Sequence, residues 1–376
     1  MNLSLSVVSR FRKREQPTST VADSNPLAAA SFGGRDRTLL GQHELDQDQN
    51  ALQGMSPEDI QREHFKKYAK PYILPGREDA PVVIMYAGLA STTLPWRETA
   101  DRINQETGLR VEVYTLKGHD GTQRTLLATS DQDWVDDIKE KIYAARENGF
   151  LPIMFFASTS AVAGVEALRQ VKTENPDDPL FGAVAMMGAP FKLRNPLHEW
   201  ALSAANWVSR HVPYADWLAT KLRWKTVPFR WDEHDRRRHP KIESVPVKTL
   251  LDLKHLKESA KEGIALIDRP VLVFQGARDG YVKPSDSREM LEYTATDRKD
   301  RRYEFFPDSP HLVMNGPEKE RFLNITLQWV NRLLEEKDFS APAVEANEAN
   351  WRRPRFQRVR RLVRRLRELW PLKAAS

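Results

Sequence analysis

From about residue 80 onward, short apolar segments alternate with segments that have the length and periodicity of amphipathic helices. The strand candidates are rich in Val, Ile, Phe and Met and cover residues 81–86, 109–115, 152–157, 182–187, 270–275 and 302–306. The helix candidates cover residues 96–103, 134–147, 161–171, 285–293 and 318–334. Apolar strands that are mostly followed by a helix predict an α/β fold, with a mostly parallel sheet covered by helices on both faces.

The alternation breaks between residues 187 and 270, where four tryptophans follow one another at spacings of 7, 10 and 7: Trp200, Trp207, Trp217 and Trp224. If these segments are helical, the four side chains lie near one helical face. Two interpretations are open. The insert is a small helical subdomain that packs on the sheet, or a lid, at about residues 190–262, whose apolar face covers an acyl-binding pocket, and the two are compatible.

Both ends of the chain differ from this regular part. Residues 1–64 are predicted to be a mostly disordered extension with a short helix, because their start is rich in Ser, Thr, Ala, Pro and Gly without a period. The sequence Ser56-Pro57-Glu58-Asp59 is typical of a helix start. The predicted order is then an α/β domain at 65–336, an Ala- and acid-rich linker at 337–350 and a basic segment at 351–376.

Most of the positive charge belongs to the basic segment. Residues 351–376 hold nine Arg, one Lys and one Glu, which gives +9, so the other 350 residues sum to −3 of the total +6. Within residues 351–370 the apolar side chains recur at helical spacing among the arginines, which predicts a basic amphipathic helix. We expect it to bind an anionic membrane surface. A nucleic acid, an acidic partner or docking on a protein body are the alternatives, and nucleic acid is not favoured.

Features that the sequence lacks exclude some classes of site and of protein. The chain has no cysteine, so disulfides and thiolate metal sites are excluded, whereas the compartment is left open. No apolar run reaches the roughly 18 residues that span a bilayer. The N-terminus is mildly apolar and then basic, the reverse of a secretory signal. We therefore expect a cytoplasmic protein, with peripheral binding at the inner membrane face through its basic helix.

Catalytic candidates follow the strands, because ligands bind at the carboxyl ends of an open parallel sheet. Asp279 lies on a polar turn after the fifth strand, and His311 follows the sixth. An aspartate so placed can accept a hydrogen bond from histidine Nδ1–H and hold its tautomer. The order nucleophile, Asp, His is the one expected for a hydrolase on this fold. The alternatives are an Asx-turn residue and a structural histidine.

The turn after the third strand offers three adjacent hydroxyls. A nucleophile elbow needs small residues two positions before and after the nucleophile, and only Thr159, between Ala157 and Ala161, meets this rule. Reactivity instead favours Ser158 or Ser160, because a β-branched residue is more strained at positive φ. The steric rule predicts Thr159, with both serines and a plain helix cap as alternatives.

Two backbone N–H groups are candidates for an oxyanion hole. One is that of Leu89, after the Gly88 turn that follows the first strand, and the other is that of Ser160, which follows Thr159. His119 is expected to shape the loop after the second strand. His234 and His239 lie in a charged loop, and we do not favour a metal site there. No cofactor or metal is expected.

Together these segments resemble bacterial carboxylesterases and monoacylglycerol-lipase-like members of the α/β-hydrolase superfamily, the serine aminopeptidase-type branch. The likeness covers roughly residues 79–336, and the matching pieces are Gly88-Leu89, the segment 116–122, Asp133-Trp134, and residues 188–196, 270–282 and 309–313. Ala-Ser-Thr-Ser-Ala stands where the family has Gly-x-Ser-x-Gly. The resemblance implies hydrolysis of a small-molecule carboxylic ester, lipid-like or acyl, through an acyl-enzyme. The alternative is a catalytically impaired binding protein held at an anionic membrane.

Overall fold

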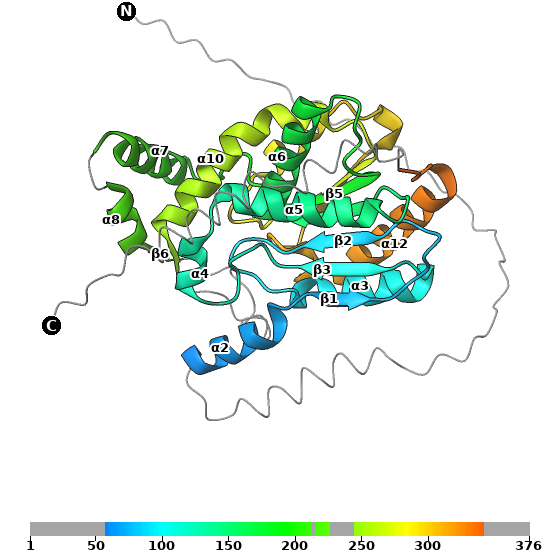
Figure 1. Cartoon of the computed structure of the whole chain (residues 1–376), viewed down its shortest axis with the longest axis horizontal. Coiled ribbons are helices and arrows are strands. Elements are labelled where there is room, and N and C mark those ends of the chain that lie inside the picture. Colours follow the sequence, from blue (N-terminus) through cyan, green and yellow to red (C-terminus); the bar gives the residue numbers. More distant parts are fainter. Residues whose placement is uncertain (1–56, 213–214, 226–243, 342–376) are drawn as a thin grey trace, which may run out of the picture. The chain divides into compact units, whose positions relative to one another are not determined.

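A seven-stranded sheet organises the computed structural model, which describes residues 57–212, 215–225 and 244–341 (Figure 1). The strand order is β1-β3-β2-β4-β5-β8-β9. All neighbouring strands are parallel except β1, which is antiparallel to β3. The bounds are β1 Tyr72–Leu74, β2 Val83–Tyr86, β3 Val111–Tyr114, β4 Ile153–Ala157, β5 Ala183–Met187, β8 Val271–Gly276 and β9 Arg301–Phe306.

Helices cover both faces of this sheet. On one face, α5, α6, α10 and α11 pack over the strands, and α3 and α12 cover the other (Figure 1). The α-helical bounds are α2 Pro57–Tyr68, α3 Leu94–Thr107, α4 Gln123–Ala128, α5 Asp131–Arg146, α6 Thr159–Glu174, α7 Pro196–His211, α8 Ala215–Lys221, α10 Val247–Gly263, α11 Pro284–Glu292 and α12 Lys319–Glu336. Short 3₁₀ turns are η1 Ile264–Leu266, η2 Arg298–Asp300 and η3 Val313–Asn315.

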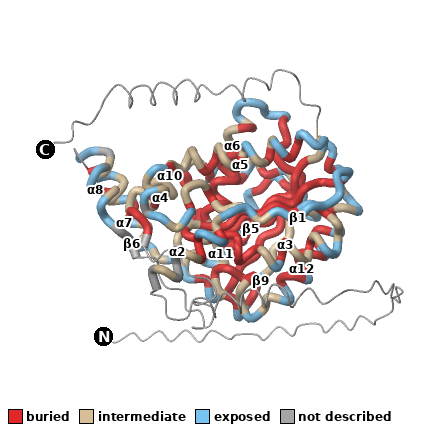
Figure 2. Tube along the Cα trace, turned by 60° about the horizontal axis from the view of Figure 1, so that its bottom comes forward, coloured by how far each residue is buried: buried red, intermediate tan, exposed pale blue. Residues whose placement is uncertain are grey.

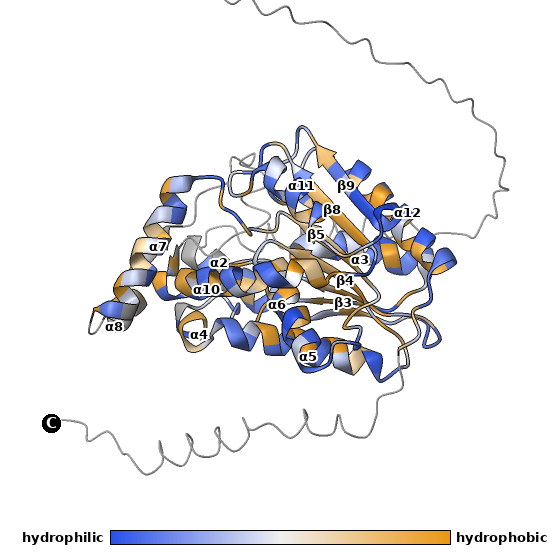
Figure 3. Ribbon diagram, turned by 90° about the horizontal axis from the view of Figure 1, so that it is seen from above, coloured by the Kyte–Doolittle hydropathy of each residue, from blue (hydrophilic) through white to orange (hydrophobic). Residues whose placement is uncertain are grey.

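The central strands are buried on both sides, which explains their uninterrupted apolar sequence. In β4, Ile153 and Phe155 pack into the core under α3 and α12, whereas Met154 and Phe156 pack into the core under α5 and α6. Figure 2 shows this buried centre, and Figure 3 shows that its strands are hydrophobic. The alternation of Cβ directions along a strand therefore supplies both core layers from one segment.

The predicted elements are confirmed as far as the regular pattern extends. All six strand candidates and all five helix candidates occur, and α2 begins at Pro57, as the helix-start sequence indicated. The sequence missed β1, a three-residue edge strand that is not buried, and the short helix α4. Both are shorter than the windows over which periodicity can be recognised.

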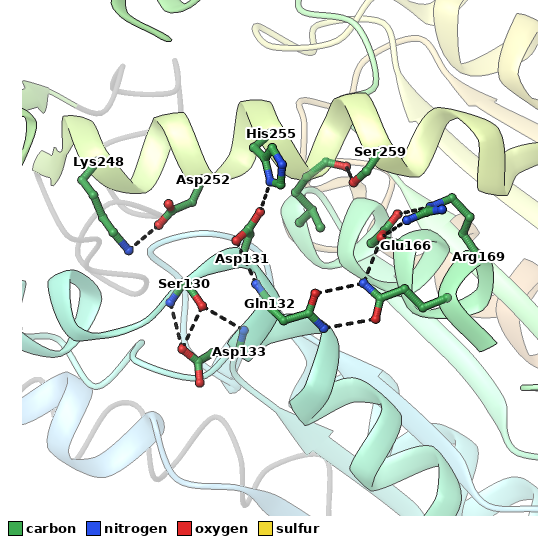
Figure 4. A network of polar contacts seen from close by, with 12 residues as sticks. Ser130, Asp131, Gln132, Asp133, Glu166, Arg169, Lys248, Asp252, His255 and Ser259 are labelled. Carbon is green, nitrogen blue, oxygen red and sulfur yellow. Dashed lines mark hydrogen bonds and ion pairs between the residues drawn. The ribbon is translucent and has the colours of Figure 1, made fainter. Parts of the chain in front are cut away.

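Polar contacts hold α5, α6 and α10 together (Figure 4). His255 Nδ1 of α10 lies 2.5 Å from Asp131 Oδ2 at the start of α5. The amides of Gln132 and Gln170 pair across α5 and α6, at 3.1 and 2.9 Å. The His255–Asp131 contact fixes the middle of α10, which forms the last part of the predicted segment at about 190–262, to the helical layer over the sheet.

The body extends past residue 336, where the sequence placed its end. Phe339 is buried, and a Cβ added to Gly182 would lie 2.4 Å from its ring. Ser340 forms a β-bridge with Phe150. The predicted N-terminal extension up to residue 56, most of the linker and the basic helix at 351–370 lie outside the described residues. Among the described helices, none is long and apolar enough to cross a membrane.

The insert consists of α7, α8 and a two-stranded ribbon formed by β6 (Arg223–Lys225) and β7 (Ser244–Pro246). Its tryptophans do not lie on one inward helical face. Trp224 belongs to β6, and the side chains of Trp200, Trp207 and Trp217 are 70, 59 and 62% exposed. These three side chains therefore neither pack on the sheet nor cover an internal pocket, because the faces of α7 and α8 that carry them point to solvent.

Candidate active site

The acid and histidine predicted from the sequence meet at the carboxyl edge of the sheet. Asp279 follows β8 and His311 follows β9, two adjacent parallel strands. His311 Nδ1 lies 2.8 Å from Asp279 Oδ2, and both side chains are buried. This geometry lets the carboxylate hold the Nδ1–H tautomer, which leaves Nε2 as the basic nitrogen. The predicted pairing of Asp279 with His311 is therefore present.

The carboxylate of Asp279 is held ionised although it is buried. Burial alone would raise its pKa, but the His311 charge and hydrogen bond outweigh this effect, with further N–H donors from Val282 and Tyr281. These two N–H groups reach Oδ1 at 3.0 and 2.7 Å. The pKa of Asp279 therefore lies below its usual range, and the residue acts as a fixed negative charge beside the imidazole.

A second side chain donates to the carboxylate oxygen that His311 uses. Gln275 Nε2 lies 3.0 Å from Asp279 Oδ2, and Ser287 Oγ donates to Gln275 Oε1 at 2.6 Å. All three side chains are buried. The opposite amide orientation would bring Oε1 against the carboxylate, so the charge of Asp279 fixes the orientation of Gln275. Nothing in the sequence distinguishes this pair, since Gln275 resembles any residue at the end of a buried strand.

The turn between β4 and α6 does not have the predicted register. Ser158 has φ 57° and ψ −123°, whereas Thr159 is the first residue of α6 and is buried. The sterically chosen position, Thr159, is thus wrong for the strained residue of the turn. Ser158 is one of only two non-glycine residues with positive φ in the described part of the chain. Such strain is typical of functional turns.

The steric rule failed because the turn accommodates a large side chain through a neighbouring glycine. In the observed register, Phe156 lies two residues before the strained position, where a small residue was expected. Its ring occupies space that Gly164 leaves open on α6, where an added Cβ would lie 2.5 Å from ring carbon Cζ. The informative sequence feature was therefore Gly164, a helical glycine eight residues further along.

The other two hydroxyls of the turn have structural surroundings. Ser160 Oγ is fully buried, accepts from the Ala157 N–H at 3.0 Å and lies 3.0 Å from the Tyr86 carbonyl oxygen. Thr159 is 1% exposed. Ser158 alone is partly exposed, and its side chain makes no capping hydrogen bond to α6. The helix-cap interpretation therefore does not apply to Ser158.

Close backbone contacts connect the turn with the histidine. The Ser158 N–H donates to the carbonyl of Met187, the residue before Gly188, at 2.8 Å. Gly188 has φ 56°, and a Cβ there would lie 2.6 Å from His311 Cε1 and 3.3 Å from Asp279 Oδ2. Only glycine fits a position that combines this φ with the imidazole at its surface. Ser158 and His311 thus both adjoin the end of β5.

The observed register changes which backbone N–H groups are candidates for the oxyanion hole. Gly88, which precedes Leu89, approaches the turn so closely that a Cβ would lie 3.0 Å from Ser158 Cβ. The residue after Ser158 is Thr159, so its N–H takes the place that the sequence analysis gave to Ser160. As the first residue of α6, Thr159 has an N–H that helical geometry leaves without an intrahelical acceptor.

The buried histidine His119 has structural surroundings. His119 packs edge-on against Trp134, and its Nδ1 lies 3.3 Å from the Lys117 carbonyl oxygen. Burial lowers the pKa of His119 to about 4, which keeps it neutral. The described residues contain no group of three or more His, Cys, Asp or Glu side chains that could hold a metal ion. His234 and His239 lie outside the described residues.

The model of one protein family, serine aminopeptidase S33, matches residues 77–318, well over half of the chain. The chain belongs to this family. The matched range contains Ser158, Asp279 and His311, so the S33-family match covers the whole candidate site. Among curated proteins, none matches this S33-family chain.

Solved structures share the fold of this S33-family hydrolase. One of the metagenome-derived lipolytic enzymes LipS and LipT aligns with a TM-score of 0.56 at 17% identity, over 71% of this chain and 98% of that chain. The monoacylglycerol lipase of Paleococcus ferrophilus gives 0.54 at 18% identity, over 69 and 97%. A soluble variant of monoglyceride lipase from Saccharomyces cerevisiae gives 0.55 at 14% identity, over 70 and 91%. The S33-family chain thus shares the α/β-hydrolase fold of these enzymes.

Proposed function

We propose that the protein hydrolyses carboxylic esters with Ser158 as nucleophile, His311 as general base and Asp279 as the acid that orients the histidine. The observation that carries the proposal is the strained conformation of Ser158 next to the end of β5, where Gly188 contacts His311. Strain of this kind persists only where the surrounding structure maintains it, and it exposes a hydroxyl at the top of the sheet.

The residues support a two-step mechanism. Ser158 Oγ attacks the ester carbonyl carbon while His311 Nε2 accepts the hydroxyl proton, and Asp279 stabilises the imidazolium. The carbonyl oxygen becomes an oxyanion that the N–H groups of Leu89 and Thr159 bind. The C–O bond to the alcohol breaks and the alcohol leaves with the proton from His311. Water then attacks the acyl-enzyme by the same steps and releases the acid and free Ser158.

The proposed substrate is a small acyl ester with an apolar, lipid-like acyl group. The fold neighbours include lipolytic enzymes and monoacylglycerol lipases by name, and the insert after β5 carries exposed apolar side chains. Acyl length is a matter for measurement. The competing hypothesis, a catalytically impaired binding protein, has less support than it had from the sequence, because a serine and not a threonine has the strained conformation.

The test is hydrolysis of a series of p-nitrophenyl esters by the purified chain. We expect turnover that His311→Ala abolishes, whereas His255→Ala, which changes a histidine of the helical layer, retains most of it. Undiminished turnover in His311→Ala would defeat the proposal. Folding of each variant is checked by its thermal unfolding curve.

The basic amphipathic segment at 351–370 remains a proposal from the sequence. We propose a cytoplasmic enzyme that this segment holds peripherally at the anionic inner face of a membrane, since each Arg near such a surface adds about 1 kcal/mol of attraction. Deletion of residues 351–376 is expected to reduce the membrane-bound fraction in a cell lysate and leave the ester turnover of the purified protein intact. An unchanged membrane-bound fraction would exclude this role.

A further inference from the structure

Exposed large apolar side chains are concentrated on the insert. Eight of the eleven such side chains in the described part of the chain lie between residues 197 and 222. Six of them form what we call the lid face, on two consecutive helices: Leu197, Trp200, Trp207, Val208, Trp217 and Leu218. The exposed stretches of α7 and α8 are visible in Figure 2. Exposed large apolar side chains that are concentrated on two consecutive helices are typical of an interaction surface.

The lid face is the outer side of helices whose inner side is anchored. On α7, positions 197, 200, 207 and 208 share one face, whereas Leu202 on the opposite side is buried. Glu199 binds Lys257 of α10 at 2.5 and 2.7 Å, and the Lys257 side chain is buried. The apolar residues therefore point outward from a helix that is held in place.

The lid face adjoins the candidate active site through the chain. Just before α7, the N–H of Arg194 donates to the Tyr281 carbonyl oxygen at 2.6 Å, and Arg194 Nη1 donates to the Asp279 carbonyl oxygen at 2.6 Å. The segment that carries the lid face thus starts from the loop of the catalytic acid.

The charge around the lid face indicates the sign of its partner. Residues 189–225 contain six Lys and Arg and two acids, which gives +4. Glu199 is paired with Lys257 and Lys192 with Asp286, so these two pairs leave the excess of +4 unchanged. Lys221 Nζ lies 5.6 Å from the centroid of the exposed Trp217 ring. The basic segment 351–376 of this chain carries charge of the same sign, so electrostatics does not favour it as the cover.

We propose that the lid face docks on an anionic lipid surface. Tryptophan is the side chain most typical of the boundary between water and lipid, because its ring is apolar and its N–H is polar. Three tryptophans with leucines and an adjacent lysine combine apolar insertion with attraction to anionic headgroups. This binding goes beyond ester hydrolysis and does not depend on it, so an inactive Ser158→Ala chain docks equally well.

The absence of cysteine allows a direct test with a single introduced thiol. Trp207→Cys, at the centre of the lid face, and Tyr293→Cys, an exposed aromatic position outside it, are each labelled with an environment-sensitive nitrobenzoxadiazole dye in the full chain. On vesicles of phosphatidylcholine and phosphatidylglycerol, we expect a blue shift and a several-fold rise in emission at position 207 alone. No change at 207, or equal changes at both positions, would overturn the proposal.

A second measurement compares vesicle co-sedimentation of two triple variants. Trp200→Ser with Trp207→Ser and Trp217→Ser removes the aromatic part of the lid face. Ile73→Ser with Tyr293→Ser and Phe305→Ser removes the three large apolar side chains that are exposed outside the insert in the described ranges. We expect the first to weaken binding at least about tenfold and the second to leave it within about twofold. Equal loss in both, or equally strong binding to vesicles of phosphatidylcholine alone, would contradict docking of this face on anionic lipid.

Discussion

The two halves of the candidate site differ in how completely local sequence determines them. At the acid–histidine half, one Asp and one His follow adjacent strands, and they meet at 2.8 Å as expected. At the nucleophile turn, three adjacent hydroxyls compete and the expected register was displaced by one residue. The difference shows that a position at the end of a strand is enough to predict a site residue when only one residue there has the required chemistry. Where several residues at one turn have that chemistry, the packing of side chains further along the chain determines which of them takes the strained conformation.

The largest expected effect is at the half where the sequence failed. Ser158→Ala removes the proposed nucleophile and should lower kcat for a p-nitrophenyl ester by about 10⁵-fold or more. Thr159→Ala keeps the backbone N–H of the oxyanion hole and should stay within about tenfold of the parent. Steady-state kinetics on both variants decides between the registers. A severe loss of kcat in Thr159→Ala with a mild loss in Ser158→Ala would identify Thr159 as the nucleophile.

The next largest effect tests the acid–histidine half, where the expected contact is present. Asp279→Asn keeps the size of the side chain but allows the wrong His311 tautomer, and kcat should fall about 10⁴-fold. Asp308→Asn is the matched control, since this carboxylate lies in the histidine loop but pairs with Arg278 at an exposed position. Kinetics of the two variants should differ by several orders of magnitude. Similar rates would remove Asp279 from the mechanism.

The packing that displaced the register gives a stability prediction. Gly164→Ala adds helix propensity of about 1 kcal/mol, but its Cβ meets the buried Phe156 ring at 2.5 Å, and overpacking costs about 1–3 kcal/mol. We expect a net loss of about 1–2 kcal/mol in the free energy of unfolding by urea. Gly280→Ala is the control, because nothing lies within 4 Å of its added Cβ.

Phe156→Leu in the Gly164→Ala background should recover part of this loss, because the shorter side chain vacates the space that the new methyl group needs. The double-mutant cycle then gives a favourable coupling energy between the two positions. Strict additivity would show that the ring of Phe156 does not depend on Gly164, and the explanation of the register would fail.

The smallest effect concerns the support of Asp279. Gln275→Met removes one donor from the carboxylate oxygen that His311 uses and should lower kcat/KM about tenfold. A carboxylate with one donor fewer is more basic and holds a proton on the imidazole more tightly. The acid limb of the kcat/KM profile should therefore move to higher pH. Ser287→Ala should shift it in the same direction by less, whereas an unchanged limb would reduce Gln275 to a packing role.

Much of the fold was predictable because it depends on repeated local patterns. Buried strands and amphipathic helices have periods that a single sequence displays, and the six mutually parallel strands were found on this basis. The edge strand β1 lacks such a pattern, and the tryptophans of the insert follow a helical spacing that does not say which face is inward. Which face of an element is buried depends on the elements packed around it, so the sequence of that element alone does not predict it.

The site was predictable to the same extent. The positions of Asp279 and His311 follow from strand order, whereas the support by Gln275 and Ser287 depends on the packing of α11 beside β8. The register at Ser158 depends on Phe156 and Gly164, whose contact spans a strand and a helix. A rule based on residue size at neighbouring positions therefore selected Thr159, whereas the strained residue of the same turn is Ser158.

The most direct test of the account is covalent labelling of the unmodified chain with a fluorophosphonate probe, followed by peptide mass spectrometry of the turn at residues 157–161. The account predicts one adduct, on Ser158, and its loss in His311→Ala. An adduct on Thr159 or Ser160, or no adduct on the folded protein, would contradict it.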